Sequence, residues 1–376
     1  MAATSPVAAL STTGAVHSKR VCAVQPAGYV ACDARVVTDA NLHPLATTDY
    51  LNGYNPAQLR TAYGLNTDAT TIVAIIDAYA NPAATVAADL AAYRTRFGLG
   101  TADLTQVNQS GVAITTVSPN AGWGQEEMLD LEMVSAICKS CKLVYVGANS
   151  ASFTDLAAAV DTAAGMGATV ISNSYGGKEF LGETTIATHF DKTGVAITVS
   201  SGDSGFGVEA PAAFNTVTAV GGTTLNLDVS NNRVSETVWS GAGSGCSAYI
   251  SKPSWQNDQA VCTRRTVADV AAVADPATGV AVYDSYGSTG GANWMVFGGT
   301  SVAAPIIGAV YALSGSTAGV PAQLAYTNAG SLFDVTSGSN GRCVRGKNTV
   351  GAYLCTGVFG YDGPTGNGTP KGTGAF

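Results

Sequence analysis

The chain has 376 residues, of which 46% are hydrophobic and only 12% charged, with a formal net charge of −8. This composition excludes an intrinsically disordered protein and a basic surface for nucleic acid, and no apolar run reaches the roughly 18 residues that span a bilayer. We therefore expect a compact globular monomer without nucleic-acid or membrane partners.

Residues 1–53 are rich in Ala, Thr, Ser and Pro and show weak periodicity. They are expected to form an extended arm, either part of the mature structure or a short pro-segment. The first residues have neither a basic n-region nor an apolar h-region, so a secretory signal, if there was one, is expected to have been removed already.

The eight cysteines fall into four pairs of near neighbours: Cys22 and Cys32, Cys138 and Cys141, Cys246 and Cys262, and Cys343 and Cys355. Zinc is an alternative for the CxxC run at 138–141, but there is no second CxxC and no histidine nearby in sequence. A thioredoxin-like motif would open a helix after a strand, whereas this run follows a helical pattern and precedes an apolar one. We predict four local disulfides and an oxidising, extracellular compartment.

From Tyr54 onward, apolar runs of the kind found in fully buried strands alternate with helical patterns. The strands are predicted at 71–77, 142–146, 168–172 and 195–200, and the helices at 86–97, 123–137 and 153–165. This alternation is typical of βαβ units and a parallel sheet, an α/β fold in which ligands bind at the carboxyl ends of the strands. Beyond Asp203 the chain becomes glycine-rich and β-like, apart from an apolar helix predicted at 301–313.

Ser301 lies between a glycine turn and this apolar helix. Glycines permit a close approach of the backbone to a ligand, and the amino end of a helix favours a developing negative charge. A serine in this place most often caps the helix, and on this segment alone the capping role is the better interpretation.

A serine nucleophile usually depends on a histidine base, and none of the three histidines is suitably placed. His17 and His43 lie in the arm, and His189 ends a helix predicted to lie at the surface. None of them has the flanking glycines of the subtilisin histidine motif, so a histidine triad is not expected.

Carboxyl groups could activate the serine in place of a histidine. Glu126 and Asp130 are four residues apart in a helical pattern, so they share one helix face. If they are buried, one pKa rises and the pair can share a proton. The alternative is an acidic first turn that complements the helix dipole, which suits Glu127 and Glu132.

Asp203 follows the buried run 195–200 in a glycine-flanked turn, which places it at the carboxyl edge of the predicted sheet. Aspartate in Gly-Asp-Ser-Gly is also an ordinary turn residue. In its protonated form, however, it can donate a hydrogen bond to an oxyanion.

Together and in this order, the segments resemble the sedolisins, or serine-carboxyl peptidases, whose fold is subtilisin-like. The matching segments are Tyr54–Tyr63, Glu126–Asp130 (E-x-x-x-D), Ile171–Gly177, Ser200–Gly205 (S-G-D-S-G) and Gly299–Pro305 (G-T-S-x-x-x-P). The resemblance implies one catalytic domain over residues 54–376, with a mostly parallel central sheet flanked by helices. Typical members carry a long folded propeptide, whereas this chain has only about 53 residues before that domain.

The resemblance also implies a role for each matching residue. Ser301 would be the nucleophile, Glu126 its base, and Asp130 the group that orients Glu126. Asp203 would complete the oxyanion hole with the Ser301 backbone N–H. Two other positions differ from kumamolisin-like sequences, namely Asp77, which turn chemistry alone would explain, and Tyr175, where some members have Trp.

The C-terminal tail resembles the calcium site of the family. Two carboxylates and several backbone carbonyls suit a hard cation with six oxygen ligands. By resemblance the Ca²⁺ ligands are Asp334, Asp362 and the carbonyls of Val335, Val358 and Gly360.

The expected function is that of a secreted, acid-active serine-carboxyl endopeptidase acting on protein or peptide substrates. Three alternatives stay open: a tripeptidyl-peptidase, a non-catalytic calcium-stabilised binding protein and a histidine-dependent subtilisin-type enzyme. The small number of charged residues suits an acidic environment. Acid unfolding is driven largely by carboxylates that must protonate, and this chain has few of them. Acidic residues outside the catalytic and calcium sets are expected at the surface.

Overall fold

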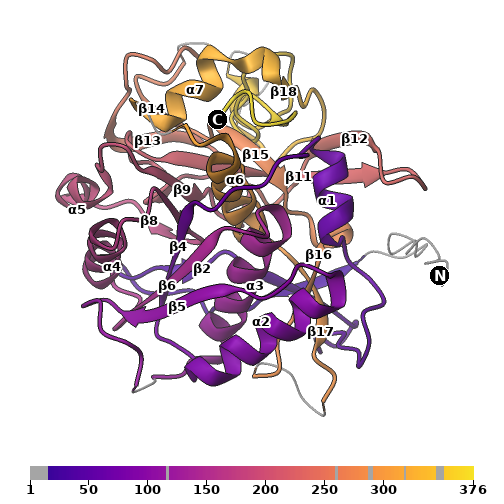
Figure 1. Ribbon diagram of the computed structural model, residues 1–376. Helices are drawn as coiled ribbons and strands as arrows, with labels where there is room; N and C mark the ends of the chain where they lie inside the picture. Colours follow the sequence, from indigo (N-terminus) through magenta and orange to yellow (C-terminus); the bar gives the residue numbers. More distant parts are fainter. Residues whose placement is uncertain (1–15, 116–117, 259–260, 287–290, 317–318, 344–350) are drawn as a thin grey trace.

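The computed structural model describes residues 16–115, 118–258, 261–286, 291–316, 319–343 and 351–376 (Figure 1). Its centre is an eight-stranded sheet. In spatial order the strands are β12 (Arg233–Val238), β11 (Thr218–Leu227), β9 (Ala196–Ser200), β7 (Val170–Asn173), β4 (Ile72–Ala78), β6 (Lys142–Ala148) and β5 (Asp103–Asn108), and β15 (Val270–Val273) also pairs with β11.

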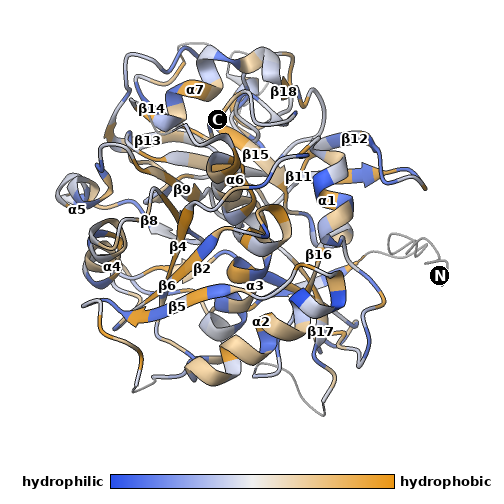
Figure 2. Cartoon of the chain, in the orientation of Figure 1, coloured by the Kyte–Doolittle hydropathy of each residue, from blue (hydrophilic) through white to orange (hydrophobic). Residues whose placement is uncertain are grey.

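The sheet is parallel except for β12, which pairs antiparallel with β11. Every residue from Val73 to Ala78 is buried, which confirms the reading of this run as a strand covered on both faces. Hydrophobic residues accordingly gather in the central strands of Figure 2. The sequence pattern did not reveal β5, because this edge strand alternates exposed and half-buried residues and carries polar side chains.

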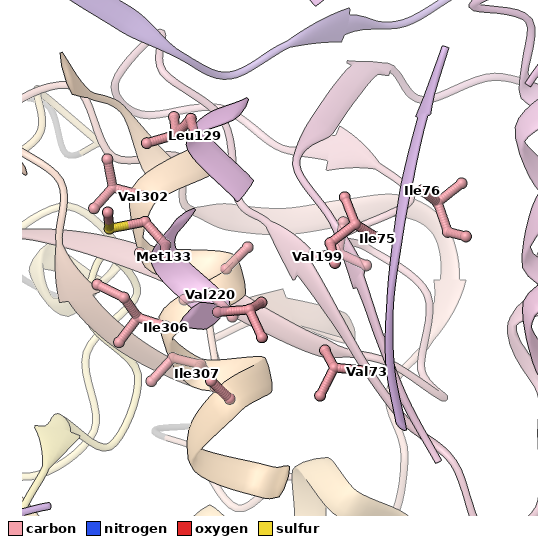
Figure 3. Packing of buried hydrophobic residues seen from close by; sticks show 14 of the residues in the cluster. Val73, Ile75, Ile76, Leu129, Met133, Val199, Val220, Val302, Ile306 and Ile307 are labelled. Carbon is pink, nitrogen blue, oxygen red and sulfur yellow. The ribbon is translucent and has the colours of Figure 1, made fainter. Parts of the chain in front are cut away.

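The described α-helices are α1 (Pro56–Ala62), α2 (Ala83–Phe97), α3 (Ala121–Ile137), α4 (Phe153–Gly165), α5 (Glu183–Ala187), α6 (Thr300–Ser314) and α7 (Pro321–Thr327). The helices predicted at 86–97, 123–137, 153–165 and 301–313 are present as α2, α3, α4 and α6, whereas α7 was not predicted. Helix α6 packs against β7, β9, β11 and β15, and α3 packs against α6 and β4. In Figure 3, Leu129 and Met133 of α3 lie beside Val302 and Ile306 of α6, and Ile76 points to the other side of β4.

Helix α3 is unusual in being buried on all sides. It contacts α1, α2, α6 and β4, and every residue from Trp123 to Ile137 is buried. Its acidic residues are therefore all inside the protein. The interpretation of Glu127 and Glu132 as an acidic first turn that complements the helix dipole is wrong, because no acidic residue lies in that turn and both side chains are fully buried.

The N-terminal arm is folded against the rest of the chain. Its strands β1 (His17–Arg20) and β3 (Arg35–Thr38) join β17 (Trp294–Gly298) and β16 (Val280–Tyr283) in an antiparallel sheet. Between them, β2 (Ala31–Cys32) pairs antiparallel with β8 (Tyr175–Lys178), whose other neighbour is β10 (Glu209–Ala210). The arm thus runs beside two segments that the sequence assigns to the site.

All four neighbour pairs of cysteines form disulfides, with Cα atoms 5.4–5.7 Å apart. The described residues contain no free cysteine, so the zinc interpretation of residues 138–141 is wrong. The thioredoxin-like interpretation is also wrong, because this run ends α3 and precedes β6 instead of opening a helix. Two short antiparallel pairs complete the fold, β13 (Gly245–Ser251) with β14 (Arg264–Val267) and β18 (Leu332–Phe333) with β19 (Thr369–Pro370). Among the described helices, none combines the length and apolar character that crossing a bilayer requires.

Candidate active site

The predicted catalytic residues meet at the carboxyl edge of the central sheet. Asp203 follows the end of β9, Ser301 lies in the first turn of α6, and Glu126 and Asp130 lie on α3. All four side chains are buried, with Asp203 the most exposed at 5%. The tight packing of α3 against α6 brings the acidic helix to the serine.

Ser301 does not cap its helix. The N-cap is Gly299, with φ of +100°, and Ser301 is the second residue of α6. Its hydroxyl is therefore free for another role, and it donates a hydrogen bond to the carbonyl of Ser174 at 3.2 Å. Its backbone N–H, which the helix leaves without an intrahelical acceptor, donates to the carbonyl of Asp33 at 3.1 Å.

Glu126 lies close enough to Ser301 for the hydroxyl to lower the pKa of the carboxyl group. Burial nevertheless dominates, and with the neighbouring Asp130 and Asp77 it raises the pKa of Glu126 well above its ordinary value. Neither carboxyl oxygen of Glu126 has a hydrogen-bond partner within the described part of the chain. Glu126 is therefore a poorly solvated carboxyl beside a hydroxyl, which suits a group that takes up and returns a proton.

Asp130 is held by Ser174, whose hydroxyl donates to its Oδ1 at 2.9 Å. Burial raises the pKa of Asp130 well above its ordinary value, and the nearby charge of Asp77 raises it further. Ser174 thus connects the acidic residues of α3 with the serine of α6, because its hydroxyl donates to Asp130 and its carbonyl accepts the Ser301 hydroxyl.

Asp77 belongs to the same carboxyl cluster, and the interpretation of Asp77 as a turn residue is wrong. It lies within β4 and is fully buried, and neither of its oxygens has a hydrogen-bond partner among the residues described. Its pKa is raised by burial, and its charge raises the pKa of Glu126 and Asp130. Tyr175 is also buried, and its hydroxyl donates to Asn173 at 2.7 Å.

Asp203 faces the amino end of α6. Its Oδ1 accepts hydrogen bonds from the backbone N–H of Thr300 at 2.8 Å and from the Thr300 hydroxyl at 3.1 Å. Its Oδ2 has no partner among the described residues. Burial raises the pKa of Asp203 to about 7, although the hydrogen bond from the Thr300 N–H and the charges of Arg20 and Arg35 partly offset the rise. Below that pH the carboxyl group carries a proton that it can donate.

The geometry of Gly299 shows that this glycine lies close to both the Asp33 carbonyl and the Asp203 carboxyl group. A Cβ atom on this glycine would lie 2.1 Å from the carbonyl oxygen of Asp33 and 2.7 Å from Oδ2 of Asp203. The site therefore requires glycine here, both for its positive φ and for the space that these two oxygens occupy.

Sequence reasoning missed two acidic residues at the site. Asp33 comes from the arm, and Glu209 packs its carboxyl against Gly176 and Gly202. Burial raises the pKa of both, and the charge of Glu209 raises the pKa of Asp33 further. No local pattern marks either residue, because each reaches the site through a strand pairing between distant segments.

The histidines lie apart from the buried serine. His17 and His43 are exposed, and His189 pairs with Asp161 at 2.7 Å on the surface. The hydroxyl of Ser301 is thus surrounded by carboxyl groups rather than imidazoles.

The expected metal ligands also lie together in the C-terminal region. Asp334 accepts the N–H of Gly360 at 2.9 Å, and Asp362 accepts the N–H of Val358 at 3.1 Å. Burial raises the pKa of Asp362 to about 8, and the Asp334 charge contributes. The described residues hold no cluster of three or more His, Cys, Asp or Glu side chains suited to a metal, so a cation here would depend on backbone oxygens, with the buried Val335 next to Asp334.

Comparisons with known proteins agree with this geometry. Residues 108–326 match the model of the subtilase family. Sedolisin of Pseudomonas sp. (strain 101) is 32% identical over 209 residues, which are 47% of this chain and 33% of that protein. Kumamolisin of Bacillus sp. (strain MN-32) is 29% identical over 322 residues, which are 75% of this chain and 56% of that protein. The matched residues thus span about a third of the length of this sedolisin and just over half the length of this kumamolisin.

A solved structure is similar over most of the fold. Pseudomonas sedolisin, described as a serine-carboxyl proteinase complexed with two molecules of pseudo-iodotyrostatin, matches with a TM-score of 0.70 and 26% identity. The match covers 87% of this chain and 96% of that one, which supports the subtilisin-like fold.

Proposed function

The chain belongs to the subtilase family, in its sedolisin branch, and from this premise we propose that it is a secreted serine-carboxyl peptidase active in acid. The observation that carries the proposal is a buried serine at the amino end of α6 with Glu126 beside its hydroxyl, and with Asp203 bound to the backbone N–H of the preceding residue, Thr300. The four disulfides support an extracellular setting.

Acyl transfer follows from this arrangement. The Ser301 oxygen attacks the carbonyl carbon of the peptide bond while its proton passes to Glu126, which in the reactive form would be the ionised member of a proton-sharing group with Asp130 and Asp77. The oxyanion accepts hydrogen bonds from the Ser301 N–H and from the protonated carboxyl of Asp203. Glu126 then gives the proton to the leaving amine as the C–N bond breaks. A water molecule repeats the attack on the acyl-enzyme, which releases the acid and restores the serine.

Asp130 and Asp77 would tune the base. Both are buried, and both raise the pKa of Glu126 when charged. A base with a raised pKa binds the serine proton more strongly than an ordinary carboxylate would. Ser174 fixes the Asp130 carboxyl, so the base is supported by a hydrogen-bonded partner.

Endopeptidase action is the form we favour, because a continuous chain already crosses the site. The arm enters beside β8 and continues as β3 beside β17, so polypeptide lies on both sides of Ser301. Mapping the products of a denatured protein by mass spectrometry tests this. Internal cuts of irregular spacing are expected, whereas a ladder in steps of three residues would indicate tripeptidyl-peptidase action.

Asp203 provides a test of the oxyanion role. Asp203→Ala should lower kcat about 100- to 1,000-fold, because it removes one oxyanion donor. Asp203→Asn should keep much more activity, since the amide oxygen can accept from Thr300 and the NH₂ group can donate. Wild-type kcat/KM should fall as pH rises through about 7, where Asp203 loses its proton. The Asn variant should lack this fall, and equal loss in both variants would contradict the role.

A calcium site in the C-terminal region is a further part of the proposal. The Oδ1 of Asp334 is buried without a hydrogen-bond partner in the described residues, and Asp362 lies beside Asp334. Two close carboxylates with a free oxygen fit a hard divalent cation. Asp334 and Asp362 would hold Ca²⁺ with the carbonyls of Val335, Val358 and Gly360, and the bound cation would neutralise the two charges and stabilise this region.

Removal of calcium should therefore lower stability. We expect EDTA to reduce the Tm of the Ser301→Ala chain by roughly 3–8 °C and added CaCl₂ to restore it. Asp362→Asn should have the low Tm with or without calcium. Asp228→Asn, at an exposed turn, is the matched control and should respond to EDTA like its parent. An unchanged Tm in EDTA would contradict the site.

A further inference from the structure

Strand β8 leads directly away from the catalytic serine. It begins one residue after Ser174, whose carbonyl accepts the Ser301 hydroxyl, and one of its edges pairs with β10. Its other edge accommodates an extended segment, β2, in the way that a peptide adds a strand to a sheet. A peptide substrate at Ser301 would extend along this backbone, so the position of β8 matters for substrate binding.

Glu179, the residue after β8, ties the end of this strand to β13. Its Oε1 accepts the hydroxyl of Ser247, and its Oε2 accepts the backbone N–H of Ala248 at 2.9 Å. The oxygen of Ser247 in turn accepts two backbone N–H groups of β13. Glu179 therefore binds the irregular part of β13, where its register with β14 shifts between Cys246 and Ser251.

Strand β13 is the anchored side of this contact. The disulfide between Cys246 and Cys262 closes the β13–β14 pair. Just before β13, Ser244 exchanges two backbone hydrogen bonds of 2.9 Å with Gly207. The end of β8 and the turn that follows it are therefore the segments that would move if the contact with Glu179 were lost.

Glu183 is a second carboxyl group in that turn and is 0% exposed. Its Oε2 accepts the N–H of Phe180 at 2.9 Å, and its own N–H donates to the Phe180 carbonyl at 3.2 Å. Its Oε1 has no donor among the described residues, but Glu179 lies within hydrogen-bond reach of its side chain. Two carboxyl groups can bond to each other only when one of them carries a proton.

Glu183 carries that proton throughout the acid range. Burial raises its pKa to about 8, the Phe180 N–H opposes this rise and the charge of Glu179 adds to it. Its pKa responds to no titratable group on the elements packed against α5, which are α4, η1 (Thr188–Phe190) and β13 (Figure 1). These groups are Asp155, Asp161, His189 and Tyr249.

We propose that protonated Glu183 donates a hydrogen bond to Glu179, and that this carboxyl pair is a clasp that positions β8 for the substrate. The inference deepens the peptidase function argued above and rests on it. Both side chains lie outside the reacting groups, so they are positioning residues. In acid the clasp is closed. When Glu183 loses its proton, two adjacent negative charges repel each other and the turn separates from β13.

The kinetic test compares Glu183→Ala and Glu183→Gln with wild type on denatured casein at pH 5. The Ala variant leaves Glu179 without its donor. It should raise KM about 5- to 10-fold and change kcat by less than about twofold, because the lost contact supports substrate binding rather than the reacting atoms. The Gln variant should match wild type, since its amide can accept from Phe180 and donate to Glu179 without a titrating proton.

Glu236→Gln is the matched control. Glu236 is also a buried carboxyl group that accepts hydroxyl groups, but its partners Tyr63, Thr223 and Thr369 belong to another part of the fold. Its replacement should leave KM unchanged. The fold of each variant is checked by its Tm.

Hydrogen exchange tests the clasp without reference to activity. In the Ser301→Ala chain, the protection factors of the Phe180 and Ala248 N–H groups are measured at pH 6 and pH 9. Both should fall about 10-fold or more at pH 9, because both groups bind carboxyl oxygens of the clasp. The chain that also carries Glu183→Gln should keep its protection at pH 9.

The outcomes separate the clasp from the function on which it rests. An unchanged KM in a folded Glu183→Ala chain would overturn the clasp and leave the peptidase function standing. Equal loss of protection in the Gln variant would also overturn it, because another group would then be responsible. If Glu183→Ala does not fold, the Gln comparison at pH 9 decides. If wild type does not digest casein, the peptidase function fails, and hydrogen exchange still decides whether the carboxyl pair holds the turn.

Discussion

Ser301→Ala should abolish digestion of denatured protein, with a loss in kcat on the order of 10⁴-fold or more. The hydroxyl is the group that would form the acyl bond, and the remaining oxyanion donors cannot replace it. The measurement is initial-rate hydrolysis of denatured casein at pH 3 to 5, the range in which ordinary carboxyl groups titrate.

Ser201→Ala is the matched control for this variant. Ser201 is also a buried serine at the carboxyl edge of the sheet, and its hydroxyl has no hydrogen-bond partner among the described residues. Its loss should leave activity nearly unchanged, which would separate the nucleophile from a general effect of removing a buried hydroxyl. Retained activity in Ser301→Ala would remove the basis of the proposed function.

The free energy of unfolding should rise as the pH falls from 8 to about 4. Burial raises the pKa of Asp203 from 3.8 to about 7, and it raises those of Asp77, Glu126 and Asp130 well above their ordinary values. Between the unfolded and folded pKa values the native state binds more protons, so stability falls as the pH rises. This stabilisation is complete below the unfolded pKa and, for Asp203, is lost by about pH 7.

The expected change in the free energy of unfolding with pH is large compared with the stability of a typical folded domain. The shift of Asp203 alone corresponds to about 4 kcal/mol between its protonated and ionised forms. Thermal unfolding of the Ser301→Ala chain at pH 4, 6 and 8 measures the effect without self-digestion. A Tm that rises toward pH 8 would mean that these carboxyl groups are paired or solvated in the native state.

This behaviour changes the interpretation of the low charge content. From the sequence we expected that a chain with few carboxylates would lose little stability when they protonate in acid. We also expected acidic residues outside the catalytic and calcium sites to lie at the surface. Instead Asp77, Glu127 and Glu132 are fully buried. Glu127 and Glu132 accept backbone N–H groups of Asn81 and Tyr283, at 3.1 and 2.9 Å. Stability in acid would then come from buried carboxyl groups that are protonated there.

Much of the fold could be predicted because burial leaves a regular pattern. Strand β4 and helix α4 agree with the apolar run at 71–77 and the helical pattern at 153–165 within one or two residues. The proximity of Glu126 to Ser301 could not be derived from periodicity, since it depends on the packing of α3 against α6. The ordered motifs shared with the sedolisins supplied that information.

The position of the arm could not be predicted. Its segments carry no strong periodicity, and β2 is only two residues long, so the register is fixed by its partner β8 and by the disulfide between Cys22 and Cys32. The contact between the Ser301 N–H and the Asp33 carbonyl is therefore a tertiary feature with no local sequence signal.

The most direct test of a serine-carboxyl mechanism is the pH dependence of kcat/KM for a peptide substrate from pH 2 to 9. The mechanism requires protonated Asp203, whose pKa lies at about 7, so a maximum below pH 6 and a steady decline through pH 7 are predicted. A maximum at neutral or alkaline pH would contradict the mechanism and indicate a histidine base instead.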